Sequence, residues 1–291
     1  MTTQTITVLP LQPHIAADIE GLDLSQPLSA EHYAQVSKAW REHLVLRFRG
    51  QTTLDAQGLI KFSSHFGKLD SKPIATQNRA VLEGTNFPEI TTISNIMVNG
   101  QSVGGLGSYE AVWHTDMTYI TAPPKGACLL AKEVPPTGGN THFLNMYYAY
   151  QTLPEKTKNK IKHLNCLHDA SRNSAGELRM GFRDTSDPRE TVGAVHPLVR
   201  KHPETQQPCL FLGRRRNAYI IGLSLTDSEA LLDELWEHAI HCEATWAQQW
   251  QVGDVVMWDN RCTMHRRDSF DAEQRRLMLR TQISGEPVLS A

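Results

Sequence analysis

The sequence predicts a mainly β fold with flanking helices and a double-stranded β-helix (jelly-roll) core. Many short segments rich in β-branched and aromatic residues are bounded by turn residues, as expected for short strands. A few segments carry helix signals, and short strands with helices packed outside them are typical of two sheets in a jelly roll. The chain has 291 residues, an ordinary length for one barrel or sandwich, so we expect a single domain over residues 1–291.

Four helices are expected. Residues 29–43 and 54–66 have apolar side chains at helical spacing, and Thr53 is the expected N-cap of the second segment. Pro154 opens a helix that should run to about Leu164, because proline is favoured in the first turn. Residues 226–229 have the form of a capping box, and an apolar helical face follows them.

Six strands and two long loops complete the expected elements. The loops, residues 100–110 and 171–193, are polar, and loops of this length in a compact domain often form lids or binding loops. The expected strands are residues 90–96, 126–131, 141–146, 208–212, 255–258 and 277–283.

The composition excludes several classes of protein. The formal net charge is −2 and no long run of Lys and Arg occurs, so neither nucleic acid nor a membrane is expected as a partner. No uninterrupted apolar stretch approaches the roughly 18 residues that would span a bilayer. The five cysteines are scattered and form no C-x-x-C pair, and no secretory signal opens the chain. These features predict a reduced, cytoplasmic protein.

His114, Asp116 and His265 form the pattern that carries most chemical information. Residues two apart on a strand point to the same face, so His114 and Asp116 can aim an imidazole and a carboxylate at one point. A second histidine from a distant strand, His265, would complete a set of two histidines and one carboxylate. That set leaves open positions on a divalent metal, as non-haem Fe(II) oxygenases require. A polar strand face with a hydrogen-bonded histidine is the structural alternative, and a zinc hydrolase the alternative enzyme.

The segment from Arg276 to Ile283 alternates between two kinds of residue. Arg276, Met278 and Arg280 fall on one face, and leucines fall on the other. One interpretation is an amphipathic strand with a solvated face. The other is that both guanidinium groups point into a barrel mouth, roughly 13 Å apart along the strand, where they clamp two different anions.

Other candidate sites are weaker. The tract at residues 214–216 (RRR) is expected to be a solvated turn, with a role at the rim of an anion site as the alternative. His238 and His241 lie three apart on an expected helix, but no third metal ligand accompanies them. Cys262 lies near His265 without a Cys-His-Asn signature, so a thiol nucleophile is not expected.

Several longer motifs occur in a fixed order along the chain. They are WHTD at residues 113–116, PPTGGNT at 135–141, HPLV at 196–199, HPET at 202–205, and GDVVMWDNR at 253–261 leading to His265. On these motifs the chain resembles the taurine dioxygenase and 2,4-dichlorophenoxyacetate dioxygenase family of Fe(II)/2-oxoglutarate enzymes over nearly its whole length.

The resemblance implies a role for each matching residue. It implies that His114, Asp116 and His265 bind Fe(II), with 2-oxoglutarate as co-substrate and O₂ as oxidant. Thr141 resembles the hydroxyl that bonds the far carboxylate of 2-oxoglutarate, and Arg276 resembles the ion-pair partner of that carboxylate. Arg280 stands where taurine-type enzymes hold the anionic group of the substrate.

Two positions differ from the taurine enzyme. Glu110 stands where that enzyme supplies an Asn to the substrate, and Lys72 lies near the position of a substrate-facing His. Lys72 retains the ability to attract an anion, so we expect it to bind substrate. These differences argue against taurine itself and leave the cofactor chemistry unchanged.

The expected reaction couples two oxidations. 2-Oxoglutarate is decarboxylated to succinate and CO₂ while a C–H bond of a small organic anion is hydroxylated, with cleavage where that carbon bears a heteroatom. A sulfonate, an aryloxy-alkanoate or an amino-acid derivative fits the basic residues. Desaturation by the same cofactors is an alternative. Relatives often form dimers or tetramers, so a homo-oligomer is a further expectation.

Overall fold

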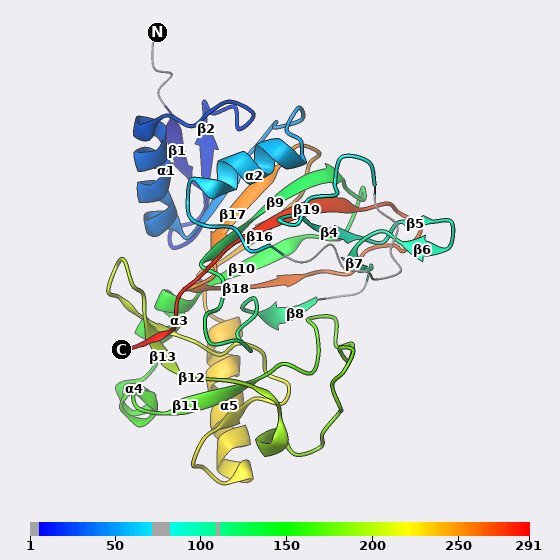
Figure 1. Cartoon of the computed structure of the whole chain (residues 1–291). Helices are drawn as coiled ribbons and strands as arrows, with labels where there is room; N and C mark the ends of the chain where they lie inside the picture. Colours follow the sequence, from blue (N-terminus) through cyan, green and yellow to red (C-terminus); the bar gives the residue numbers. More distant parts are fainter. Residues whose placement is uncertain (1–5, 72–81, 109–110) are drawn as a thin grey trace.

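The computed structural model describes residues 6–71, 82–108 and 111–291, and the expectation of a mainly β protein is confirmed (Figure 1). Its largest sheet has eight strands, in which neighbouring strands are mostly antiparallel. In spatial order the strands are β1 (Thr7–Pro10), β2 (Ala17–Glu20), β3 (Val45–Phe48), β17 (Val255–Asp259), β9 (Gly126–Glu133), β19 (Leu277–Ile283), β4 (Thr91–Ser94) and β7 (Gly105–Leu106).

A four-stranded sheet packs against the inner face of this large sheet. The rings of Phe143 and Trp258, from the two sheets, have their centres 5.7 Å apart, and both belong to one buried cluster that also contains Met264 and Met278. The strands of the smaller sheet are, in spatial order, β16 (Thr245–Gln248), β10 (Thr141–Asn145), β18 (Thr263–Arg267) and β8 (Ala111–His114).

Helices α1 (Ala30–His43) and α2 (Ala56–Ser64) cover the outer face of the large sheet (Figure 1). The expected start of α1 is confirmed, since the Ser29 hydroxyl accepts a hydrogen bond from the His32 amide. The expected N-cap of α2 at Thr53 is wrong. Asp55 caps this helix because its carboxylate accepts from the Gly58 amide at 2.7 Å.

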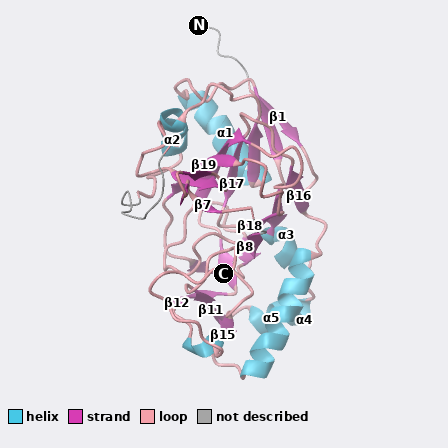
Figure 2. Ribbon diagram, turned by 90° about the vertical axis from the view of Figure 1, so that its right-hand side faces the viewer, coloured by secondary structure: helices cyan, strands magenta, loops and turns pink. Residues whose placement is uncertain are grey.

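The remaining helices lie at the other end of the molecule, near two three-stranded sheets (Figure 2). The cap expected at Thr226 is two residues too late: Ser224 caps α5 (Leu225–Ile240) by accepting from the Asp227 amide. The apolar face of α5 is buried as predicted. These helices are α3 (Met146–Gln151), α4 (Glu155–Ile161), α5 (Leu225–Ile240) and the 3₁₀ helix η1 (Pro188–Glu190).

Within the described ranges no helix is long and apolar enough to cross a membrane.

Short strands complete the fold. Two of the short strands, β6 (Gln101–Ser102) and β7, fall inside the segment expected to be one loop at residues 100–110. The strands are β11 (Asn165–Asp169), β12 (Gly193–Pro197), β15 (Tyr219–Ile220), β13 (Val199–Lys201), β14 (Pro208–Leu210), β20 (Leu289–Ser290), β5 (Met97–Val98) and β6 (Gln101–Ser102).

Strand β19 has the alternation that the sequence predicts, but neither face is solvated. Leu279 and Ile283 pack with the outer helices, and the Thr281 hydroxyl lies 2.7 Å from the hydroxyl of Ser63 in α2. Met278 joins the core between the two sheets. The interpretation as an amphipathic surface strand is therefore wrong, because β19 lies between β9 and β4 with both faces covered.

Candidate active site

Strands β8 and β18 bring the two histidines of the site together. Their antiparallel pairing sets His114 directly opposite His265, and the centres of the two rings lie 4.2 Å apart. The Nδ1 of His114 donates to the Val112 carbonyl oxygen at 2.7 Å, and its Nε2 faces Asp116 across the site. Two imidazoles from distant segments therefore meet at one point, as the sequence predicts.

Asp116 reaches the same point from a turn and not from a strand. Strand β8 ends at His114, so the expectation that both residues share a strand face is wrong. The side-chain amide of Asn260 holds the turn: its oxygen accepts from the Asp116 amide at 2.8 Å, and its nitrogen donates to the Asp116 carbonyl oxygen at 3.1 Å. The carboxylate oxygens lie 3.7 Å from Nε2 of His114 and 4.0 Å from Nε2 of His265.

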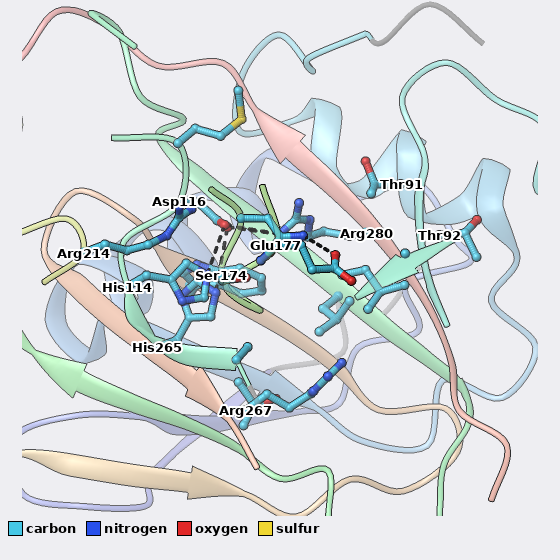
Figure 3. A pocket seen from close by; sticks show the side chains of 18 of the residues that line it. Thr91, Thr92, His114, Asp116, Ser174, Glu177, Arg214, His265, Arg267 and Arg280 are labelled. Atoms are coloured by element: carbon cyan, nitrogen blue, oxygen red, sulfur yellow. Dashed lines mark hydrogen bonds and ion pairs between the residues drawn. The ribbon is translucent and has the colours of Figure 1, made fainter. Parts of the chain in front are cut away.

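The protonation states of this cluster suit a divalent metal. Burial alone would raise the pKa of Asp116, but Arg280 and the two histidines outweigh it, and the pKa lies well below its usual range. Burial, with a smaller contribution from His114, lowers the pKa of His265 to about 3, so its imidazole is neutral at physiological pH. One ligand atom from each residue lies within 4.8 Å of the other two (Figure 3). A carboxylate and two imidazoles could hold the ion.

Gly213 supports the turn that carries Asp116. Its carbonyl oxygen accepts from the amide of Thr115, the residue between the two ligands, at 3.1 Å. Its φ is +68°, and a Cβ at this position would lie 2.0 Å from Nδ1 of His168 and 2.7 Å from the hydroxyl of Thr118. Only glycine meets both demands, because the conformation is left-handed and the space is filled.

Replacing Gly213 by alanine should therefore lower the free energy of unfolding by about 2–5 kcal/mol, from left-handed strain plus overpacking. Gly222 is the matched control, since its φ is +87° but nothing lies within 4 Å of an added Cβ. Gly222→Ala should lower the free energy of unfolding only by the backbone strain, about 1–2 kcal/mol. Urea unfolding of both variants measures the difference, and equal losses would show that the contact with His168 is unimportant.

The three candidate ligands line a cavity of about 260 Å³ between the two sheets. The loop at residues 171–193 contributes to its wall, as the sequence suggests for a binding loop. The described lining residues with polar or charged side chains are Thr91, Thr92, His114, Asp116, Tyr119, Thr141, Asn173, Ser174, Glu177, Arg179, Arg214, Trp258, His265, Arg267, Arg276 and Arg280.

Thr141 and Arg276 line the same cavity as the metal cluster. Arg276 directly precedes β19 and is 2% exposed, and its Nε has no hydrogen-bond partner. No described carboxylate pairs with it. Burial, and then the nearby Arg267, lower the pKa of Arg276 to about 9. Trp250 donates to the Thr141 hydroxyl at 3.0 Å. An arginine buried without a counter-ion suits a bound carboxylate.

Arg280 has a partner inside the protein. Its Nη1 lies 3.2 and 3.3 Å from the two carboxylate oxygens of Asp116. Arg280 therefore holds a candidate metal ligand in place, a role that the sequence does not indicate. Two other positions from the sequence, Lys72 and Glu110, lie outside the described residues.

The tract at residues 214–216 divides among three environments. Arg214 lines the metal cavity, Arg215 pairs with Glu229 and Asp233, and Arg216 is exposed. The prediction of a solvated turn is therefore wrong for Arg214. Because all three residues are arginines, the sequence does not indicate which side chain lines the cavity.

The other candidates do not form a second reactive site among the residues described. His202, Asp259 and Cys262 cluster, but Arg261 occupies both oxygens of Asp259. Burial raises the pKa of the Cys262 thiol well above its usual value, so it stays protonated. His238 hydrogen-bonds to Ala149 and Thr152, as expected for a structural histidine.

A family model described as "Taurine catabolism dioxygenase TauD, TfdA family" matches residues 7–282. The chain belongs to the TauD/TfdA family. It is 32% identical to the alpha-ketoglutarate-dependent 2,4-dichlorophenoxyacetate dioxygenase of Cupriavidus pinatubonensis, over 98% of this chain and 100% of that protein. It is also 32% identical to the alpha-ketoglutarate-dependent sulfate ester dioxygenase of Pseudomonas putida, over 97% of this chain and 90% of that protein.

A solved structure agrees with this assignment. The crystal structure of AAD-2 in complex with Mn(II) and N-oxalylglycine superposes with a TM-score of 0.79 at 31% identity, covering 98% of this chain and all of that chain. The resemblance inferred from the motifs is thus confirmed. This TauD/TfdA protein is an Fe(II)- and 2-oxoglutarate-dependent dioxygenase that uses O₂, and its His-Asp-His cluster and buried Arg276 fit those cofactors.

Proposed function

We propose that this dioxygenase oxidises a small organic anion, with aryloxy-alkanoates and sulfate esters as the leading classes. The charge of the cavity carries the proposal. Among its described lining residues, five arginines face two acidic side chains, Asp116 and Glu177. A divalent ion and the 2-oxoglutarate dianion cancel each other in charge, so the loaded site retains an excess of positive charge. An anionic prime substrate compensates that excess.

The residues have separate roles in this proposal. His114, Asp116 and His265 hold the iron, and Thr141 and Arg276 bind the far carboxylate of 2-oxoglutarate. Bound iron supplies the power to activate O₂, and 2-oxoglutarate leaves as succinate and CO₂.

Arg280 and Asn260 act on Asp116 and fix the direction of its carboxylate. Such supporting contacts set the orientation of a ligand. Arg280 retains donors beyond Nη1, so it also binds the substrate anion, together with Lys72. Where the hydroxylated carbon bears a heteroatom, the product collapses and releases a phenol, a sulfate or an equivalent fragment.

The fold supports the same proposal. We assign the eight-stranded and four-stranded sheets to a double-stranded β-helix core in one domain over residues 1–291. Both sheets contribute to one buried cluster, and the cavity lies between them, with Leu129 and Arg280 from one sheet and Thr141 and His265 from the other. Desaturation of the substrate remains the second outcome that this site allows, because it requires the same cofactors.

A panel of matched compounds tests the proposed function. Protein loaded with Fe(II) is supplied with 2-oxoglutarate, O₂ and either an anion or its neutral counterpart, and succinate is measured. We expect 2,4-dichlorophenoxyacetate or octyl sulfate to stimulate succinate formation, and 2,4-dichlorophenoxyethanol and 1-octanol to have no effect. Protein loaded with zinc is the control and should form no succinate. Equal stimulation by the neutral compounds would contradict an anionic substrate, and hydrolysis by the zinc protein would favour the zinc hydrolase.

A further inference from the structure

We propose that Arg214 and Arg179 form a second oxoanion-binding position on the prime-substrate side of the metal cavity, distinct from Arg280. The position takes a group with several acceptor oxygens, such as an organic sulfate or carboxylate. This inference rests on the proposed function, because it concerns the substrate of the same site. It makes two loop residues, and not β19 alone, responsible for capturing the anion.

The backbone fixes Arg214 beside the metal cluster. Arg214 follows Gly213, whose carbonyl oxygen is hydrogen-bonded to the Thr115 amide between two candidate ligands. In Figure 3, Arg214 and Arg280 are drawn on either side of Asp116. An anionic group bound by Arg214 therefore lies close to the metal. This position suits a substrate in which the reacting carbon is next to the charged group.

The guanidinium of Arg214 is only partly satisfied. It donates through Nη1 to the Arg172 carbonyl oxygen, while its buried Nε has no hydrogen-bond partner. No carboxylate in the described part of the chain forms an ion pair with it, whereas its neighbour Arg215 has two. Burial and then the proximity of Arg179 lower the pKa of Arg214. An anion would relieve both the desolvation and the repulsion.

Arg179 completes the position from the loop at residues 171–193. Its guanidinium carbon lies 3.9 Å from the centre of the Tyr119 ring, and its amide donates to the Ser171 carbonyl oxygen at 2.7 Å. These contacts hold the charge at the cavity wall without neutralising it. Two acidic groups of the same loop have partners other than Arg179: Asp184 pairs with Arg172, and Glu177, which also lines the cavity, accepts from Asn173.

Arg280 cannot supply the whole anion site. Its Nη1 is hydrogen-bonded to both oxygens of Asp116, so moving fully onto a substrate would release a metal ligand. Neither Arg214 nor Arg179 forms an ion pair with a described carboxylate. They can bind and release an anion while the ligand set stays unchanged.

Binding to a complex that cannot turn over tests this inference. Protein loaded with Mn(II) and N-oxalylglycine, in which an NH replaces a CH₂ of 2-oxoglutarate, is titrated by calorimetry with octyl sulfate, 2,4-dichlorophenoxyacetate or inorganic sulfate. We expect Arg214→Met and Arg179→Met each to weaken binding of at least one organic anion by about tenfold or more. Arg214→Lys should restore part of the affinity, since it keeps the charge. Arg216→Met, in the same tract but exposed, should leave affinity unchanged.

The outcomes separate this inference from the proposed function. If the wild type fails to take up Mn(II) and N-oxalylglycine, the proposed function itself fails. If it loads normally but none of the three anions binds, or if both Met variants bind them as tightly as the wild type does, the second anion position is wrong. Should Arg214→Met unfold, Arg179→Met alone decides. Weakened binding of inorganic sulfate together with unchanged binding of both organic anions would identify an adventitious ion site only, and would also overturn the inference.

Discussion

Asp116→Ala should reduce succinate formation by at least about 100-fold, since losing even a partner of a metal ligand commonly costs 10–100-fold. Asp116 is the only acidic member of the His114, Asp116 and His265 cluster. The two remaining ligands are imidazoles, which carry no negative charge, so the variant loses the single negative charge of the cluster that offsets the ion. Mn(II) binding, measured without substrate, should fall in parallel with activity.

The same substitution should also destabilise the metal-free protein. Arg280 is hydrogen-bonded to both oxygens of Asp116, and its side chain is 13% exposed. Removing the carboxylate leaves this charge without its partner, which for buried pairs costs roughly 3–5 kcal/mol. Unfolding in urea, with metal removed by a chelator, measures this loss.

A double variant separates the two effects of Asp116. Asp116→Ala combined with Arg280→Met removes both charges, so it should recover much of the stability lost in the single variant. It should not recover Mn(II) binding, because the ligand is still missing. Near-normal activity of the single variant would refute the assignment of Asp116 as a ligand, whatever its stability.

Sequence periodicity predicted those parts of the site that depend on long regular strands. The alternation in β19 correctly separated Leu279 and Ile283 from Met278 and Arg280, because a strand has a fixed two-residue repeat. It could not tell that both faces would be covered. Burial depends on the neighbouring strands and on the outer helices, which the segment itself does not encode.

Turns and single side chains were harder to predict than strands. The spacing of His114 and Asp116 predicts that the two side chains meet, and they do, but through a different geometry, since β8 ends at His114 and the Asn260 amide positions Asp116. Asn260 lies far away in the sequence, so no local pattern indicates the contact. For residues 214–216 the sequence leaves a solvated turn and a role at the rim of an anion site as alternatives, and it does not single out Arg214 as the residue that lines the cavity.

Arg276→Met should weaken 2-oxoglutarate binding and, at the same time, stabilise the free protein. Arg276 is 2% exposed and pairs with no described carboxylate, so in the absence of co-substrate it is a desolvated charge. Replacing even a buried ion pair by apolar side chains of similar volume is often neutral or stabilising by about 1–4 kcal/mol, and an unpaired buried charge has no Coulombic attraction to lose. The melting temperature of the apoprotein should therefore stay the same or rise.

The apparent KM for 2-oxoglutarate should rise by about 10–100-fold, because a hydrogen bond to a charged group contributes roughly 1.5–3 kcal/mol. The KM for the prime substrate should change much less, and the reverse pattern would mean that Arg276 and Arg280 exchange roles. Arg275→Met is the matched control. Arg275 is the preceding residue but pairs with Glu133 at the surface, so its loss should leave both KM values unchanged.

Co-substrate should reverse the order of stability between the wild type and Arg276→Met. A ligand that binds only the folded state stabilises it according to its concentration relative to Kd. At saturating N-oxalylglycine with Mn(II), the wild type gains more than the variant and should melt at the higher temperature, while without ligand the variant should melt at an equal or higher one. This crossing distinguishes an arginine kept for an anion from one kept for the fold. If the variant melts well below the wild type in both conditions, Arg276 is a structural residue and the carboxylate of 2-oxoglutarate is bound elsewhere.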